Sequence, residues 1–93
     1  MVEQDPANSF ARYGLAMEYA KTDPALAVTE FATLLNQDPN YVAAYYHSGQ
    51  TLEKLGRLEE AKEIYEKGIG ASTRKGDAHT RAEIEAALSL LPI

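Results

Sequence analysis

Apolar side chains recur at spacings of three and four along most of the chain, which is the period of an amphipathic helix. No run alternates between apolar and polar residues, and no Asn-Gly or Asp-Gly pair marks a hairpin turn. The pattern therefore predicts an all-α protein. We place its helices at about 6–21, 24–36, 39–55 and 58–74, with a fifth that starts after residue 77 and ends before Pro92.

Three Asp-Pro pairs, at 5–6, 23–24 and 38–39, each precede one of these helices. An aspartate can accept hydrogen bonds from the free N–H groups at a helix start, and proline suits the first helical position. Asp77 is positioned to cap the fifth helix in the same way. The connections between helices are short, as expected between antiparallel neighbours.

The first two helices and the next two are copies of one pattern. The matching pairs are Ala16 with Gly49 and Tyr19 with Leu52 at an offset of 33, then Ala27 with Ala61, Phe31 with Tyr65 and Leu34 with Gly68 at an offset of 34. A helix-turn-helix unit of about 34 residues has the period of the tetratricopeptide repeat (TPR).

The second copy, at about 40–75, resembles this family in its residues as well. The family pattern has a large aromatic, a small and a large apolar residue in the first helix, then alanine, an aromatic and a small residue in the second, and finally a closing proline. The first six are Tyr45, Gly49, Leu52, Ala61, Tyr65 and Gly68 here. The first copy, at about 6–39, supplies Ala16, Tyr19, Ala27, Phe31 and Pro39.

The chain departs from the family pattern at a few positions. Arg12 stands in place of the leading aromatic, Ser48 in place of a leucine, and Leu34 in place of the late small residue. Thr73 replaces the closing proline, so we expect the fourth helix to run on. Late in that helix, Gly68 should mark a close approach between helices, because glycine otherwise costs roughly 1 kcal/mol of helix propensity.

The resemblance implies antiparallel helix pairs stacked as a short right-handed superhelix, an alpha-alpha superhelix of about five helices. We expect a single domain over 1–93, with repeats at about 6–39 and 40–75 and a capping helix at about 77–91. Ile84, Leu88 and Leu91 would cover the second repeat, while Arg81, Glu83 and Glu85 would face water.

Composition narrows the function. The 93 residues carry 14 acidic and 9 basic side chains, a net charge of -5, whereas nucleic-acid binding needs a basic face. The absence of cysteine excludes disulfides and thiolate metal sites. No apolar run approaches the ~20 residues that span a bilayer, and the N-terminus lacks the pattern of a secretion signal. We therefore expect a soluble, cytoplasmic protein without nucleic-acid or membrane partners.

Catalytic chemistry has little support in the sequence. Glu59, Glu60, Glu63 and Glu66 could form an acid/base or metal site, but their i,i+4 spacing to lysines is typical of a solvated helix face. His47 and His79 lie on different helices without a metal-ligand spacing. No Gly-x-Ser-x-Gly elbow or phosphate loop occurs. We expect no enzyme activity, no cofactor and no metal.

In proteins that resemble TPRs, the first helix of each repeat lines a concave groove for an extended peptide. The positions that this resemblance implies are Phe10, Tyr13, Met17, Lys21, Ala43, Tyr46, Gln50 and Lys54. Residues 10, 13 and 17 share one helix face, as do 43, 46 and 50. The alternative is that these apolar side chains belong to the core, and for Phe10 and Met17 it stays open.

The resemblance implies a non-enzymatic protein–protein interaction module. Aromatic rings would supply buried area, Gln50 a hydrogen bond, and Lys21 and Lys54 attraction to acidic groups. The lysine and asparagine clamp that some relatives use for a chaperone's terminal carboxylate is missing. An alternative function is oligomerisation, or a place in a longer repeat scaffold, because three or more repeats are usual. Phe10 or Met17 would then pack against a second copy.

Overall fold

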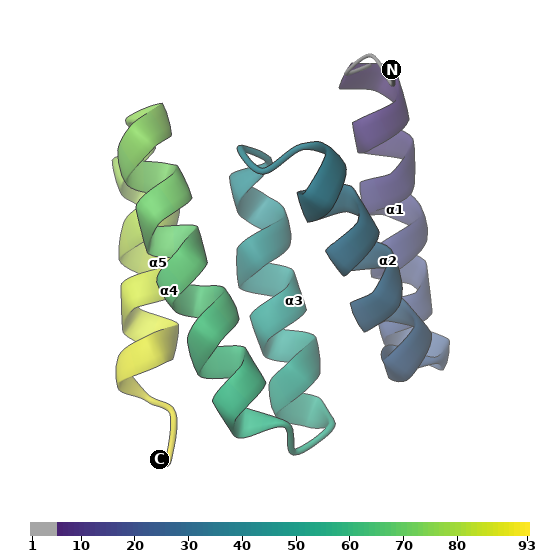
Figure 1. The fold of residues 1–93 in the computed structure, drawn as a ribbon. Helices are drawn as coiled ribbons and strands as arrows, with labels where there is room; N and C mark the ends of the chain where they lie inside the picture. The colour runs from purple at the N-terminus through teal and green to yellow at the C-terminus, as the bar shows by residue number, and fades with distance from the viewer. Residues whose placement is uncertain (1–5) are drawn as a thin grey trace.

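The computed structural model describes residues 6–93. Over this range the chain forms five helices, α1 (Pro6–Thr22), α2 (Pro24–Gln37), α3 (Val42–Lys54), α4 (Leu58–Lys75) and α5 (Ala78–Ser89), joined by short turns (Figure 1). No strand occurs in this part of the chain, so the prediction of an all-α fold is confirmed. None of the helices within 6–93 is long and apolar enough to cross a bilayer.

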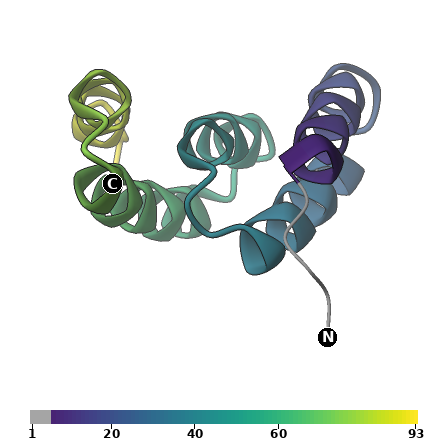
Figure 2. The same cartoon turned by 90° about the horizontal axis from the view of Figure 1, so that it is seen from above.

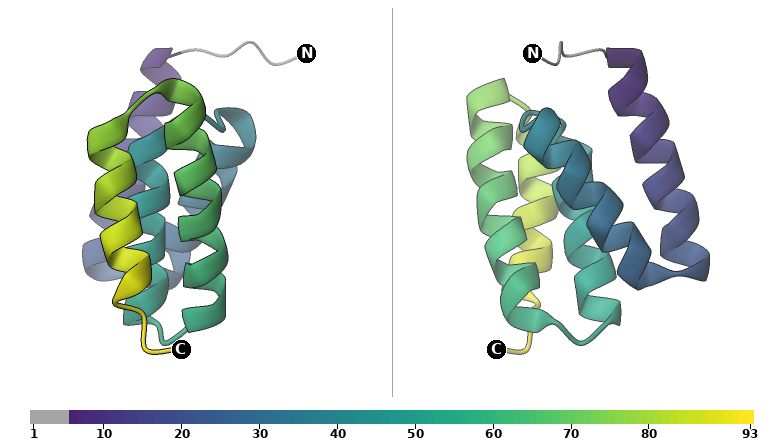
Figure 3. Two further views of the ribbon diagram at one scale, coloured as in Figure 1. Left: turned by 90° about the vertical axis from the view of Figure 1, so that its left-hand side faces the viewer. Right: turned by 45° about the vertical axis from the view of Figure 1, so that its right-hand side comes forward.

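The helices stack in two layers along an arc. Figure 2 shows α1, α3 and α5 along one side of the arc and α2 and α4 along the other. Each helix packs against its neighbours in sequence, and the central α3 contacts all four other helices. In the right-hand view of Figure 3, α2 runs between α1 and α3. The second helix of one pair thus packs against the first helix of the next pair, and this stacking builds a superhelix.

Two of the predicted aspartate caps are present. The Leu26 backbone N–H donates to the Asp23 carboxylate over 3.3 Å, with Pro24 at the first position of α2. Asp77 accepts from the backbone N–H of Thr80 over 3.0 Å and from its hydroxyl over 2.8 Å. These bonds from Thr80 hold the pKa of the Asp77 carboxyl below its usual value. Asp5, of the first Asp-Pro pair, lies outside the described residues.

The prediction that Asp38-Pro39 starts a helix is wrong. The Asp38 backbone N–H donates to the Leu34 carbonyl over 2.7 Å and so closes α2, while its own carbonyl accepts from the Tyr41 N–H. α3 therefore begins at Val42, three residues later than expected, and no side chain caps it. The Pro39 carbonyl accepts a hydrogen bond from the Tyr45 hydroxyl over 2.7 Å.

This difference between two Asp-Pro pairs is testable by alanine substitution. Asp23→Ala is expected to lower the free energy of unfolding by about 1 kcal/mol, because it removes a helix cap. Asp38→Ala is the matched control and should change it by less than about 0.5 kcal/mol, since its side chain makes no cap. Urea titrations of both variants measure the two values. Equal losses would show that Asp23 does not act as a cap.

Close approach at two glycines organises the second repeat. A Cβ built on Gly49 would clash with the Tyr65 ring, and one on Gly68 would lie 2.6 Å from the Tyr45 Cβ and 2.9 Å from Ile84. Gly68 thus lets α3 and α5 pack against α4, which confirms its predicted role. Tyr65 and Ile84 are fully buried.

The departures from the family pattern are accommodated locally. Arg12, in place of an aromatic residue, forms an ion pair of 2.9 Å with Glu30 and links α1 to α2. α4 continues to Lys75 and ends where Gly76 adopts a positive φ of 75°. The longer fourth helix that the missing proline predicted is therefore confirmed. In the left-hand view of Figure 3, α5 lies alongside α4 at the end of the stack.

Candidate functional site

A cleft opens between α1 and α3, the first helices of the two pairs. We call it the concave cleft. It has a volume of about 320 Å³ and is lined by Met17, Ala20, Lys21, Tyr46, His47, Gln50, Thr51 and Lys54. α1 and α3 touch at few positions, which leaves room for this cleft between them. The helix period brings residues 17, 20 and 21 to one face of α1, and 46, 47, 50, 51 and 54 to one face of α3.

Both charged residues of the concave cleft are lysines. Lys21 and Lys54 lie in the last turns of α1 and α3, where the helix dipole favours a positive charge. The Lys54 ammonium lies 3.5 Å from the Ala20 carbonyl, so it bridges the two helices. Lys21 lies 3.4 Å from Glu18, but both side chains are more than 70% exposed, so this pair contributes little and does not bind Lys21 tightly.

Above the concave cleft, an aromatic cluster joins the two repeats. The Tyr13 ring lies 5.1 Å from Tyr41, 5.9 Å from His47 and 6.4 Å from Phe31, measured between ring centroids. Tyr46 packs edge-to-face on His47 at 5.2 Å. Aromatic pairs at such distances contribute about 0.5–1.5 kcal/mol beyond their buried area. The cluster therefore fixes the spacing of α1 and α3 and with it the width of the cleft.

Burial sets the protonation of this cluster. It lowers the pKa of His47 from its ordinary value, against a smaller opposing effect of Glu83, so the imidazole is neutral at pH 7. It raises the pKa of Tyr13, with a further contribution from Tyr41. Lys21 and Lys54 thus carry the positive charge of the cleft at neutral pH, and the aromatic cluster adds apolar contact area.

Gln50 is tied to the second repeat by hydrogen bonds. Its side-chain N–H donates to the Tyr65 hydroxyl oxygen over 2.9 Å, and the Tyr65 O–H donates to the Glu53 carboxylate over 2.5 Å. Burial raises the pKa of Tyr65, and the bond to Glu53 raises it further. The phenol therefore keeps its proton at all physiological pH values. Gln50 itself remains exposed on the cleft side.

The concave cleft contains five of the eight positions that the resemblance implied, namely Met17, Lys21, Tyr46, Gln50 and Lys54. Ala43 is half-buried and Tyr13 packs in the aromatic cluster, and neither lines the cleft. Phe10 is 69% exposed, so it is not a core residue. Sequence reasoning missed Ala20, His47 and Thr51. Their positions next to Lys21, Tyr46 and Gln50 on the same helix faces were the available signal.

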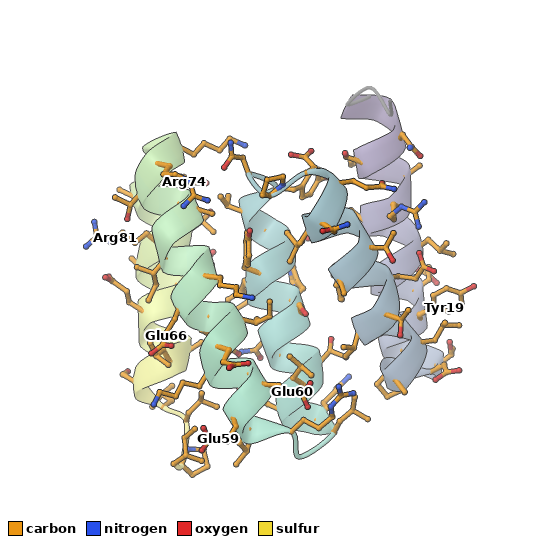
Figure 4. The ribbon with its side chains drawn as sticks, in the orientation of Figure 1. Tyr19, Glu59, Glu60, Glu66, Arg74 and Arg81 are labelled. Atoms are coloured by element: carbon orange, nitrogen blue, oxygen red, sulfur yellow. The ribbon has the colours of Figure 1, made fainter. Side chains whose placement is uncertain are left out.

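The glutamates of α4 lie on its solvated face. Glu59, Glu60 and Glu66, which are labelled in Figure 4, are all exposed. Glu60 forms a two-point ion pair with Arg57 at 2.7 Å, which lowers the pKa of its carboxyl. Among residues 6–93, no three His, Cys, Asp or Glu side chains gather where they could hold a metal ion.

A smaller cleft of about 160 Å³ lies between α2 and α4, on the other side of the stack. Its lining is largely apolar, with Val28 and Ala32 from α2 and Ile64 from α4. Its charged lining residues are Glu60, Glu63 and Lys67, so their charges partly cancel. The concave cleft is the larger of the two and carries charge of one sign only.

The fold and this geometry match known proteins. A tetratricopeptide repeat family model matches residues 42–75, which include α3 and α4. The solution structure of a TPR domain protein from Salinibacter ruber has a TM-score of 0.86 and 34% identity, covering 96% of this chain and 91% of that one. The chain belongs to the tetratricopeptide repeat family.

Two further comparisons agree with this TPR assignment. A crystal structure of a TPR domain protein from Salinibacter ruber has a TM-score of 0.80 and 34% identity, and covers 86% of this chain and 91% of that one. A TPR repeat-containing protein of Pseudomonas aeruginosa is 26% identical over 85 residues, which is 90% of this chain and 81% of that protein. TPR domains act in general as protein–protein interaction modules, and membership indicates that class of function here.

Proposed function

We propose that this TPR domain is a non-enzymatic interaction module whose concave cleft binds an acidic peptide segment of another protein. The observation that carries the proposal is the charge of the cleft. The chain has a net charge of -5, yet the charged residues that line the cleft are Lys21 and Lys54. Because charge complementarity steers encounter and selects partners, this local reversal favours an acidic ligand.

The remaining lining suits a peptide chain. The Met17 thioether and the Tyr46 ring offer apolar contact area, and such side chains are enriched at binding surfaces. Gln50 adds a polar group one helical turn from both Tyr46 and Lys54 on α3. A volume of about 320 Å³ accommodates a few residues of an extended segment, at the low end of the range for ligand pockets.

Charge reversal of the two lysines tests this proposal. In Lys21→Glu plus Lys54→Glu, binding of a short blocked peptide of Asp, Glu and Ala should weaken at least about tenfold, because attraction becomes repulsion at the site. The matched control is Lys62→Glu plus Lys67→Glu, which makes the same change in net charge on α4. Isothermal titration at low salt measures both. If both double variants weaken binding equally, net charge and not the cleft governs it.

A second candidate function is assembly of two copies of the chain through α1. The observation in its favour is the exposure of Phe10, whereas Met17 is half-buried in the cleft lining. Sedimentation over a range of concentrations distinguishes the two functions. A mass of 10.2 kDa at every concentration removes this candidate, whereas a larger mass that Phe10→Ala abolishes supports it.

A further inference from the structure

The hydrogen bonds between Glu53, Tyr65 and Gln50 have only one possible direction. A carboxylate can only accept, so the Tyr65 O–H must donate to Glu53. The single phenolic proton is then used, and the Tyr65 oxygen can only accept from Gln50. Gln50 must therefore turn its NH₂ group toward Tyr65. The orientation of this amide, which is usually ambiguous, follows from the charge of Glu53.

This fixed orientation matters because Gln50 also lines the concave cleft. Its amide is planar, and its oxygen lies on the opposite side of Cδ from the nitrogen that donates to Tyr65. Resting on the proposed function, we infer that Glu53 and Tyr65 fix the Gln50 amide so that its oxygen is available as a hydrogen-bond acceptor in the cleft. The cleft then selects an acidic peptide that offers a backbone N–H to the Gln50 oxygen. Tyr65 and Glu53 are then positioning residues, and Gln50 is the contacting one.

The surroundings of the three residues support this arrangement. The Tyr65 side chain is fully buried, with its ring against Gly49, so the ring cannot swing away. Glu53 is half-buried in the last turn of α3, one turn beyond Gln50. A buried phenol without a partner is costly, which keeps both hydrogen bonds in place. Gln50 lines the cleft together with Tyr46 and the two lysines, so a ligand in the cleft would have its backbone within reach of the Gln50 amide.

The test compares a blocked peptide of Asp, Glu and Ala with analogues in which one backbone amide is replaced by an ester. The ester removes one N–H donor and leaves the peptide's shape and charge. At one position, the replacement should weaken binding to the native protein about tenfold, because the Gln50 oxygen loses its partner. In Tyr65→Phe this loss should fall below about threefold, because the Gln50 amide is then free to turn.

Two further variants separate positioning from stability. Tyr45→Phe removes a hydroxyl that bonds the Pro39 carbonyl, away from Gln50, and should keep the tenfold ester effect although it also loses a hydrogen bond. Glu53→Ala keeps the phenol but leaves its proton free to donate to the Gln50 oxygen. The amide should then turn its NH₂ toward the cleft, and the ester effect should disappear. This variant serves as well if Tyr65→Phe fails to fold.

The possible outcomes are distinct. A tenfold ester effect in the native protein and Tyr45→Phe, reduced below about threefold in Tyr65→Phe and absent in Glu53→Ala, supports the inference. Tight peptide binding without an ester effect at any position overturns the inference and leaves the proposed function standing. An ester effect that persists in Glu53→Ala also overturns it. If no acidic peptide binds the native protein, the proposed function fails, and the inference fails with it.

Discussion

Replacing Phe31 by alanine is expected to lower the free energy of unfolding by about 3–5 kcal/mol. The Phe31 side chain is fully buried in α2, and its ring packs edge-on against Tyr13 of α1. Its loss removes apolar contact and leaves a cavity between the two helices of the first repeat. Because a domain of this size has a total stability of about 5–15 kcal/mol, we expect a large fall in the midpoint of urea denaturation.

The chain contains a matched control, since Phe10 is its only other phenylalanine. Phe10 is 69% exposed, so Phe10→Ala removes the same atoms without opening a cavity. It should change the free energy of unfolding by less than about 0.5 kcal/mol. Circular dichroism during urea titration reports both values. Comparable losses in the two variants would mean that α1 packs differently and that Phe10 belongs to the core.

The helices themselves could be predicted from the sequence, but one of their starts could not. Asp23-Pro24 and Asp38-Pro39 are identical dipeptides after a helix, and only the first opens the next helix directly. The backbone N–H of each aspartate closes the preceding helix, Asp23 onto the Tyr19 carbonyl and Asp38 onto the Leu34 carbonyl, so this bond does not distinguish them. α1 and α2 are separated by a single residue, which places the Asp23 carboxylate at the first turn of α2. Four residues separate α2 from α3, so Asp38 lies too far from the start of α3 to cap it. The length of the turn between α2 and α3 depends on how the helices pack and not on local residue preference.

The candidate site was predictable to the extent that it follows one helix face. The spacing of Met17 and Lys21, and of Tyr46, Gln50 and Lys54, places them together. That spacing does not indicate that Tyr41, in the turn after α2, packs against the Tyr13 ring. Nor does it indicate that Tyr13 is absent from the cleft lining.

The hydrogen bonds of Tyr65 were likewise beyond sequence reasoning. They join residues 15 and 12 positions apart, Gln50 and Glu53 on α3 to Tyr65 on α4. Whether three such side chains meet depends on the register of the two helices. Gly49 sets this register, because the Tyr65 ring lies directly against its Cα. The repeat pattern thus predicts the aromatic residue and the glycine, but not the polar partners at the end of the ring.

Placing alanine at Gly68 should separate three helices. The added Cβ would lie 2.6 Å from the Tyr45 Cβ on α3 and 2.9 Å from Ile84 on α5. The Tyr45 Cβ is attached directly to the backbone, so it cannot turn aside, and α3 and α4 must move apart. We expect a loss of about 1–3 kcal/mol, the usual cost of overpacking, even though alanine favours the helix over glycine by about 1 kcal/mol.

Gly70 provides the opposite case, two residues further along the same helix. A Cβ there would meet only the end of the Arg74 side chain, at 3.5 Å. Gly70→Ala should therefore stabilise the protein by about 0.5–1 kcal/mol, because the helix propensity of alanine is gained without a clash. Urea denaturation midpoints should shift in opposite directions for the two variants. A rise in the midpoint for Gly68→Ala as well would show that α4 is not pressed between α3 and α5 at Gly68, and that the late glycine of the repeat has another cause.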